Sequence, residues 1–338
     1  MSGTLAAAGK YASSMGEFEL IERFFKRAAS RNPLGVGDDC ALLAPAPGMQ
    51  LAVSTDMLVE GRHFLSTVDP SALGHKALAV NLSDLAACGA TPLAFSLALA
   101  LPRVDESWLE GFSRGLFALA DAHGCELVGG DTTQGPLNIC ISVFGEVPAG
   151  QALLRSGARA GDDIYVSGTL GDARLALEVF RGRLSVAADV FEAARIRMEQ
   201  PTPRVGLGQA LRGIATSAID VSDGLAGDLG HVLQQSGLGA RVETTAAMGL
   251  LAAAADSGAG AGVLSTETRL ELVLAGGDDY ELVFTAPASA REAIQAAAAA
   301  SKTPVTRIGR TETEPGLRLV DAQGALLQRR YASFDHFA

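Results

Sequence analysis

The chain has 338 residues, of which 48% are apolar, and its 38 acidic and 27 basic side chains give a formal net charge of −11. This length suggests two domains of ordinary size, and the composition argues against a disordered, collagen-like or coiled-coil protein. An acidic surface repels nucleic acid phosphate, so we expect no nucleic acid partner, although metal ions can still join carboxylates to phosphate ligands.

The sequence predicts neither export nor a membrane partner. Residues 1–14 carry one lysine and a short alanine run, which is too weak a pattern for a signal peptide. The most apolar window, 77–101, contains Asn81, Asp84 and Pro92, and a central carboxylate is costly in a bilayer. The cysteines lie apart, without CxxC spacing, at Cys40, Cys88, Cys125 and Cys140. Reduced, mostly buried thiols fit a cytoplasmic protein.

In the first half of the chain, hydrophobic spacing predicts helices and strands in alternation. We expect helices at 17–29, 70–88 and 106–123. We expect strands at 50–55, 93–101, 126–128 and 137–147. Gly89 and Gly124 follow two of the helices at positions where glycine commonly ends a helix. The stretch Pro148-Ala149-Gly150 predicts a domain boundary.

The second half continues the alternation. We expect strands at 163–167, 217–221, 280–285 and 305–309. We expect helices at 204–213, 225–235 and 288–300 and another that begins at Asp172. Elements of both periods throughout the chain predict an α/β or α+β fold built in layers.

Aspartates gather in short segments rich in glycine or serine, which we predict to be turns at strand ends. These segments are Gly37-Asp38-Asp39, Ser54-Thr55-Asp56, Leu82-Ser83-Asp84, Gly129-Gly130-Asp131, Asp220-Val221-Ser222-Asp223-Gly224 and Gly276-Gly277-Asp278-Asp279. One such pair is usually a turn former or a helix cap. Six of them favour a shared cleft, where cations must neutralise the carboxylates. Oxygen ligands from Asp, Ser and Thr suit Mg²⁺, which completes its shell with phosphate and water.

The absent motifs narrow the chemistry further. The sequence contains no GxxxxGK[ST], GxSxG or HExxH, and no lysine follows a glycine-rich run. A nucleotide would therefore be held through metals and arginines. Arg155 and His63 are candidates for phosphate or substrate contacts, although an exposed arginine and a histidine beside Phe64 are more often structural.

In this order, the motifs resemble the thiamine-monophosphate kinase family of the aminoimidazole ribonucleotide synthetase-like superfamily. The matching strings are GEF at 16–18, GVGDDCA at 35–41, STD at 54–56, KALAVNLSDLAA at 76–87, GGDTT at 129–133, RSGA at 155–158, AIDVSDGL at 218–225, GGDDYEL at 276–282 and FDHF at 334–337. The resemblance covers the chain from Gly16 onward. It implies an N-terminal extension at 1–15, an N-terminal domain for ATP, Mg²⁺ and dimerisation at 16–148, and a C-terminal α/β domain at 149–338.

The resemblance also implies an activity and a site. The activity is ATP-dependent phosphorylation of thiamine monophosphate to thiamine diphosphate, by a homodimer whose N-terminal strands form a shared barrel. The implied ligands of several Mg²⁺ ions are Asp39, Ser54, Thr55, Asp56, Asp84, Asp131, Asp220 and Asp223. Of these, Asp56, Asp131 and Asp223 are expected to be catalytic. The implied ATP contacts are Gly130, Asp131, Arg155 and Ser222, and the implied substrate contacts are His63, Asp278 and Phe334.

Two of these positions depart from the family pattern. Relatives commonly carry Glu at the position of Asp278 and can carry Tyr at that of Phe334. The shorter carboxylate changes how substrate is contacted, and the phenyl ring keeps stacking against a flat heterocycle but loses a hydroxyl. Both departures affect local contacts only.

The chemistry expected from this set is direct, in-line phosphoryl transfer without a phosphoenzyme. The acceptor phosphate is already ionised, so charge neutralisation and positioning are the main tasks and no general base is required. Two alternatives remain. Another ATP-using synthetase of the superfamily is one, although a selenide-using enzyme would want a lysine near Cys40. A non-catalytic divalent-metal-binding module is the other, but it leaves Arg155 and the aromatic tail unexplained.

Overall fold

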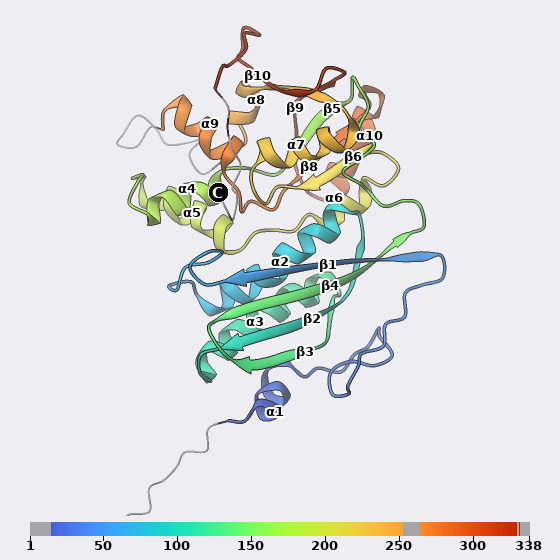
Figure 1. Cartoon of the computed structure of the whole chain (residues 1–338), viewed down its shortest axis with the longest axis vertical. Coiled ribbons are helices and arrows are strands. Elements are labelled where there is room, and N and C mark those ends of the chain that lie inside the picture. Colours follow the sequence, from blue (N-terminus) through green and yellow to red (C-terminus); the bar gives the residue numbers. More distant parts are fainter. Residues whose placement is uncertain (1–14, 253–263, 330, 332–338) are drawn as a thin grey trace, which may run out of the picture.

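The computed structural model describes residues 15–252, 264–329 and 331, which form two domains that follow one another along the long axis of the molecule (Figure 1). The first domain contains a four-stranded sheet and the second a six-stranded sheet. Helix α2 (Pro70–Ala87) lies where the two domains meet and packs against elements of both, β1 and β4 on one side and β6 and α6 on the other.

The first sheet has the strand order β1-β4-β2-β3. Its strands are β1 (Met49–Val59), β2 (Thr91–Leu101), β3 (Glu126–Gln134) and β4 (Asn138–Pro148). β2 and β3 run parallel, and the other neighbours are antiparallel. β1 and β3 are therefore the two edges of the sheet. Upstream, α1 (Glu17–Leu20) continues into a π-helical turn at Ile21–Phe25.

Helix α2 and helix α3 (Glu106–His123) pack on one face of this sheet and begin at aspartate caps. The carboxylate of Asp69 accepts from the backbone N–H of Ser71 at 2.8 Å, and that of Asp105 accepts from Trp108 at 3.1 Å. The two helices cross closely at Gly115, where a Cβ would lie 1.8 Å from the carbonyl oxygen of Ser71. This glycine is required because no backbone shift of that size is cheap.

The second sheet has the order β10-β7-β9-β5-β8-β6. Its strands are β5 (Asp163–Ser167), β6 (Ser217–Asp220), β7 (Gly239–Glu243), β8 (Leu282–Ala286), β9 (Val305–Glu312) and β10 (Gly316–Val320). The accompanying helices are α4 (Asp172–Phe180), α5 (Ala188–Glu199), α6 (Val205–Ala210), α7 (Leu225–Ser236), α8 (Thr244–Met248), α9 (Thr266–Ala275) and α10 (Arg291–Ala300), with a 3₁₀ turn at Ala288–Ala290. Among the described residues, no helix combines the length and apolarity needed to cross a bilayer.

The larger apolar core runs without a break from the first domain into the second. It joins Leu78 and Leu82 of α2 to Leu207 of α6 and Phe284 of β8, all of them buried. Burial of apolar side chains from both domains in one cluster stabilises their arrangement, at roughly 25 cal/mol for each Å² removed from water. The two domains therefore present a fixed surface to each other.

Most predicted elements are confirmed, with shifts at their ends. The helices at 70–88 and 106–123 and the strand at 163–167 agree with the structure closely. The helix predicted to reach residue 29 ends at Phe25, because Lys26 is extended. The strand predicted at 50–55 continues to Val59, and the one predicted at 126–128 continues to Gln134. The pattern did not predict α5, α8, α9, β7 and β10.

The aspartate segments were predicted to be turns at strand ends, and this is wrong for three of them. Asp56 and Asp131 lie within β1 and β3, and Asp84 lies inside α2. Asp220 is the last residue of β6, and Asp223 and Asp278 lie in turns as predicted. The edge strands of the first sheet tolerate carboxylates in mid-strand because parts of their faces are not covered by helices.

Candidate active site

Four aspartates from three elements and one turn converge on a cavity between the two domains. Asp56 comes from β1, Asp84 from α2, Asp220 from the end of β6, and Asp223 from the turn after it. The cavity has a volume of about 270 Å³, and Ser222, His63 and Asp278 also line it. These members of the predicted site are therefore brought together by the contact between the domains.

Helix α2 holds three parts of this cluster in place. The hydroxyl of Ser83 donates to Oδ2 of Asp220 over 2.8 Å, across the domain boundary. The hydroxyl of Ser54 donates to the carboxylate of Asp84. The side-chain oxygen of Asn81 accepts from the backbone N–H of Asp56 at 3.1 Å. Each contact fixes a backbone or side chain at the acidic end of the cavity.

The carboxylates at this end destabilise one another's charged forms. Burial raises the pKa of Asp220 to about 8, and the charge of Asp84 adds to the effect. Burial, with the charges of Asp84 and Asp223, raises the pKa of Asp56 to about 6. Burial also raises the pKa of Asp84, against the hydrogen bond from Ser54 and the positive charge of Arg155. A cation between these groups would relieve the repulsion.

The donor set fits a hard divalent cation that keeps much of its own shell. Carboxylate and hydroxyl oxygens are the ligands Mg²⁺ prefers, and Mg²⁺ usually takes few of them from protein. Within the part of the chain that the structure describes, no group of three His, Cys, Asp or Glu side chains is arranged to hold an ion unaided. Water and phosphate oxygens would therefore complete the coordination.

Basic side chains also line the cavity. They are Arg174 of α4, Arg181 directly after α4, and Arg62 from the loop after β1. Glu178, buried on α4, accepts from Arg174 at 2.9 Å and from Arg181 at 3.2 Å, and so holds both guanidinium groups. The cavity thus contains both carboxylates and guanidinium groups, a combination that suits a phosphate ester bound through metal. His63 is held nearby, with its Nδ1 accepting from the backbone N–H of Val59 at 3.0 Å.

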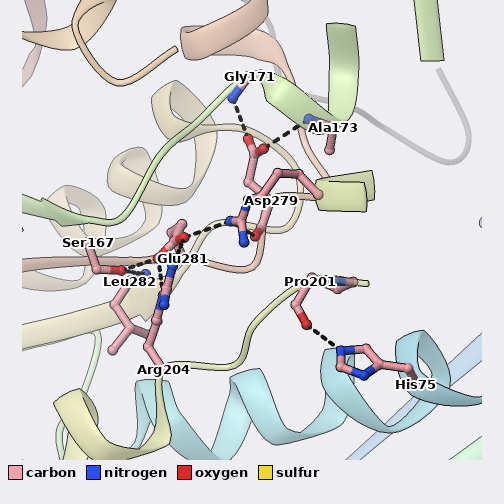
Figure 2. A network of polar contacts seen from close by, with 10 residues as sticks. His75, Ser167, Gly171, Ala173, Pro201, Arg204, Asp279, Glu281 and Leu282 are labelled. Carbon is pink, nitrogen blue, oxygen red and sulfur yellow. Dashed lines mark hydrogen bonds and ion pairs between the residues drawn. The ribbon is translucent and has the colours of Figure 1, made fainter. Parts of the chain in front are cut away.

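Alternate side chains anchor the GGDDYEL segment, whose Asp278 lines the cavity, within the second domain (Figure 2). Asp279 is buried and accepts from the backbone N–H groups of Gly171 and Ala173 at 2.9 and 3.4 Å, at the start of α4. Glu281 is fully buried and accepts from Arg204 at 2.5 and 2.6 Å and from Ser167 at 2.6 Å. Arg197 donates to the same carboxylate at 2.7 Å.

Sequence reasoning did not single out these supporting residues. The pattern that could have indicated them is the run of four polar side chains in GGDDYEL. A turn alone does not require three carboxylates so close together. Lys76 was also missed as a site residue. Its Nζ lies 2.5 Å from Oδ2 of Asp278, although 202 positions separate the two in sequence.

The remaining predicted residues lie elsewhere in the chain. Asp39, Gly130 and Asp131 line a second hollow of about 820 Å³, on the side of β3. Gly130 has a φ of +149°, and a Cβ there would lie 1.8 Å from the carbonyl oxygen of Leu97. Only glycine fits this approach of β3 to β2.

The strand order explains the separation of the two groups. Asp56, Ile141, Leu97 and Gly130 lie in one row across the sheet, so Asp56 and Asp131 belong to opposite edges. Three strand spacings of about 4.8 Å place these edges about 14 Å apart. One chain therefore does not bring Asp131 to the four converging aspartates.

Three predicted residues lie at the margins. Thr55 points to the other face of the first sheet from Asp56, and its Oγ1 lies 2.7 Å from Oγ of Ser142. Arg155 is exposed and acts on Asp84 by its charge. Phe334 lies outside the described residues.

Comparison with known proteins agrees with the fold. Residues 37–147 match the N-terminal domain of AIR synthase related proteins, and residues 159–322 match the C-terminal domain. The chain is thus an AIR synthase-related protein of two domains. Hydrogenase maturation protein HypE in complex with ATP shares the fold, with a TM-score of 0.70, 23% identity, and coverage of 94% of this chain and 92% of that one.

The relatives found by sequence indicate a narrower family than the domain models do. The chain is 47% identical over 328 residues to the thiamine-monophosphate kinase of Salmonella typhimurium, covering 96% of this chain and 98% of the relative. Identity to the Escherichia coli K12 enzyme of that name is also 47%, with the same coverage. The crystal structure of thiamine-monophosphate kinase from Stenotrophomonas maltophilia matches with a TM-score of 0.79 and 44% identity, covering 89% of this chain and 94% of that one.

A ThiL structure complexed with AMPPCP and TMP matches with a TM-score of 0.71 and 29% identity, covering 87% of this chain and 89% of that one. The chain belongs to the thiamine-monophosphate kinase family. The family and two-domain fold expected from the sequence motifs are confirmed.

Proposed function

We propose that this protein transfers the γ-phosphoryl group of ATP to thiamine monophosphate, forming thiamine diphosphate in the biosynthesis of that cofactor. The observation that carries the proposal is the convergence of Asp56, Asp84, Asp220 and Asp223 in a cavity that arginines also line. A kinase whose acceptor is itself a phosphate must bring two anions together, and this cavity offers both metal ligands and positive charge. Identity to thiamine-monophosphate kinases over nearly the whole chain supports the same reaction.

The protein's residues have separate tasks in this reaction. The aspartates would hold Mg²⁺, which when bound offsets the charge of the phosphates during transfer. We assign Ser222 and Arg155 to the nucleotide, and His63 and Asp278 to thiamine monophosphate; Ser222, His63 and Asp278 line the cavity. The acceptor oxygen already carries charge, so the residues orient the two phosphates in line and need take no proton from the acceptor. Phosphoryl transfer is direct, without a phosphoenzyme.

We further propose a homodimer built on the first sheet. β1 is an edge strand, and its outer face carries the exposed apolar side chains of Leu51, Val53 and Met57. Exposed apolar side chains on a sheet edge favour a protein contact. Closing a barrel from two four-stranded sheets would cover this face on both copies.

The same dimer accounts for the separation of the predicted ligands. If β3 of the partner lies beside β1, Asp131 of the partner subunit comes near Asp56, and the hollow containing Asp39 and Gly130 adjoins the acidic cavity. The site would then be shared, with the nucleotide contacted by both copies. We assign 16–148 and 149–338 as the domains and place the protein in the cytoplasm.

The test is incubation of the protein with ATP, Mg²⁺ and thiamine monophosphate, followed by separation of the thiamine phosphates. We expect thiamine diphosphate and ADP in equal amounts, and none without Mg²⁺. D223N is the matched control, because it removes one carboxylate charge while keeping the size of the side chain. ATP consumption without thiamine diphosphate would favour another synthetase of the superfamily, and the absence of ATP turnover would favour a metal-binding module.

A further inference from the structure

Helix α2 carries a lysine where helix packing calls for an apolar residue. Lys76 is 2% exposed, and its ammonium group forms an ion pair of 2.5 Å with Oδ2 of Asp278. A buried ammonium is costly unless an anion compensates it, and a methionine of similar length would cost less. The ion pair with Asp278 therefore explains why a lysine is buried here, and packing of the apolar core does not.

The lysine lies on the face of α2 that forms the active cavity. Lys76, Val80 and Asp84 are spaced four residues apart, which places them on one side of the helix. Val80 and Asp84 line the cavity. Lys76 lies one helical turn before Val80 and contacts Asp278, which also lines the cavity. The residue thus reaches the site through the carboxylate that it holds.

Asp278 is held in an uncommon conformation by its surroundings. Its φ is +71°, in the left-handed region, and its backbone N–H donates to the carbonyl oxygen of Ser222 at 2.8 Å. Its side chain is 34% exposed and lines the cavity, while Lys76 fixes one oxygen. Because both its backbone and its side chain are held, the carboxylate of Asp278 has a fixed orientation in the cavity.

We propose that Lys76 is a positioning residue for substrate recognition: it holds the carboxylate of Asp278 in the orientation that receives the thiamine part of thiamine monophosphate. This inference rests on the proposed function, in which Asp278 contacts that substrate. Thiamine offers a cationic thiazolium ring and an aminopyrimidine, and a fixed carboxylate favours either group. Lys76 acts on substrate binding, and phosphoryl transfer takes place at the converging aspartates.

The experiment compares steady-state constants of the wild type with those of K76M, D278N and the double variant K76M/D278N. We expect K76M to raise KM for thiamine monophosphate about tenfold, the loss expected for a charge-assisted hydrogen bond, and to leave KM for ATP and kcat within about twofold. The double variant should raise KM no more than D278N alone, because Lys76 works through Asp278. K76Q, which can still donate a hydrogen bond, should recover part of the affinity.

His75 offers a matched control on the same helix. Its Nε2 lies 2.8 Å from the carbonyl oxygen of Pro201 (Figure 2), so this neighbouring residue also joins α2 to the second domain, through Pro201 and not through Asp278. We expect H75A to leave KM for thiamine monophosphate unchanged. An equal rise in H75A would show that loosening the domain contact causes the effect, and the inference would be wrong.

Additive effects of K76M and D278N, or equal rises in KM for both substrates, would also overturn the inference. Thermal unfolding of each variant checks that it is folded at the assay temperature. If K76M is not folded, K76Q and K76Q/D278N carry the same comparison. A wild type that forms no thiamine diphosphate would refute the proposed function instead, so the two failures are distinguishable.

Discussion

The hydroxyl of Ser83 donates a hydrogen bond of 2.8 Å to Oδ2 of Asp220, and this contact ties α2 of the first domain to the last residue of β6 in the second. Both side chains are buried. The contact orients a carboxylate whose other oxygen can face a cation, as outer residues do at metal sites.

Removal of this hydroxyl should weaken metal binding. In S83A, Asp220 loses the donor that opposes the rise of its pKa by burial, so its charged form becomes less favourable. We expect Mg²⁺ affinity to fall about tenfold, measured as the shift of the unfolding temperature with Mg²⁺ concentration. S113A removes a buried hydroxyl of α3 outside the cavity and should leave the affinity unchanged. Equal affinities in S83A and wild type would contradict this role.

The raised pKa values predict how stability depends on pH without metal. Burial, with the charge of Asp84, brings the pKa of Asp220 to about 8, above its ordinary value of 3.8. The folded state therefore binds more protons than the unfolded state between these values, so the free energy of unfolding falls as pH rises. Urea unfolding in EDTA from about pH 5 to about pH 8 measures this slope. The slope should be shallower in D220N. An unchanged slope would show that Asp220 does not cause the pH dependence.

The affinity for Mg²⁺ should rise with pH, whereas the free energy of unfolding without metal falls. Asp220 and Asp56, whose pKa is raised to about 6, must lose their protons to become ligands. Binding of Mg²⁺ therefore releases protons and strengthens as pH rises. Titrations over the same pH range should show this trend, with a weaker trend in D220N.

The buried carboxylate of Glu281 anchors the GGDDYEL segment next to the cavity through ion pairs with two arginines. It is fully buried between Arg197 and Arg204, and its loss would leave two arginines partly buried without their anion. We expect E281Q to lower the free energy of unfolding by about 3 kcal/mol, measured by urea. E243Q is a suitable comparison, because Glu243 is half exposed and lies 3.6 Å from Arg307, and it should cost less than about 1 kcal/mol. Similar losses in both variants would contradict a special role for Glu281.

The sequence predicted the long elements well because their signals are local. The helix at 70–88 combines a continuous apolar face with Gly89, whose φ of +69° is the left-handed ending that glycine favours. Helix α5 was missed because its apolar residues include Ile196, which is exposed, so its spacing carries little signal. The short strands β7 and β10 gain their stability from neighbours far along the chain.

The acidic character of the candidate site was predictable from the sequence, but its arrangement and its supporting residues were not. The strings around Asp56, Asp84, Asp220 and Asp223 indicated an acidic phosphate site from residue type alone. The ion pair of Lys76 with Asp278 and the hydrogen bond of Ser83 with Asp220 depend on the contact between domains, which no local pattern encodes. The separation of Asp131 from Asp56 follows from the order of the strands, since β1 and β3 form opposite edges.

The exposed face of β1 predicts the oligomeric state. Val53 is 59% exposed, and a lysine there would place a charge in the middle of the proposed dimer contact. We expect the wild type to have the mass of a dimer by light scattering and V53K that of a monomer. I196K places the same charge on an exposed apolar position of α5 and should remain dimeric. A monomeric wild type would refute the shared barrel.

Mixed dimers test whether each active site is shared between two copies. D56N and D131N should each abolish turnover as homodimers. In a shared site, a heterodimer of the two variants holds one site with both substitutions and one with neither, so activity returns. Random pairing after co-expression should give about a quarter of wild-type activity, because half of the dimers are mixed and each keeps one intact site. D56N with D84N is the control: both residues line the same cavity of one chain, so no site in their mixed dimer is intact. Full inactivity of the D56N and D131N mixture, with mixed dimers present by mass spectrometry, would place Asp131 outside a site shared with Asp56.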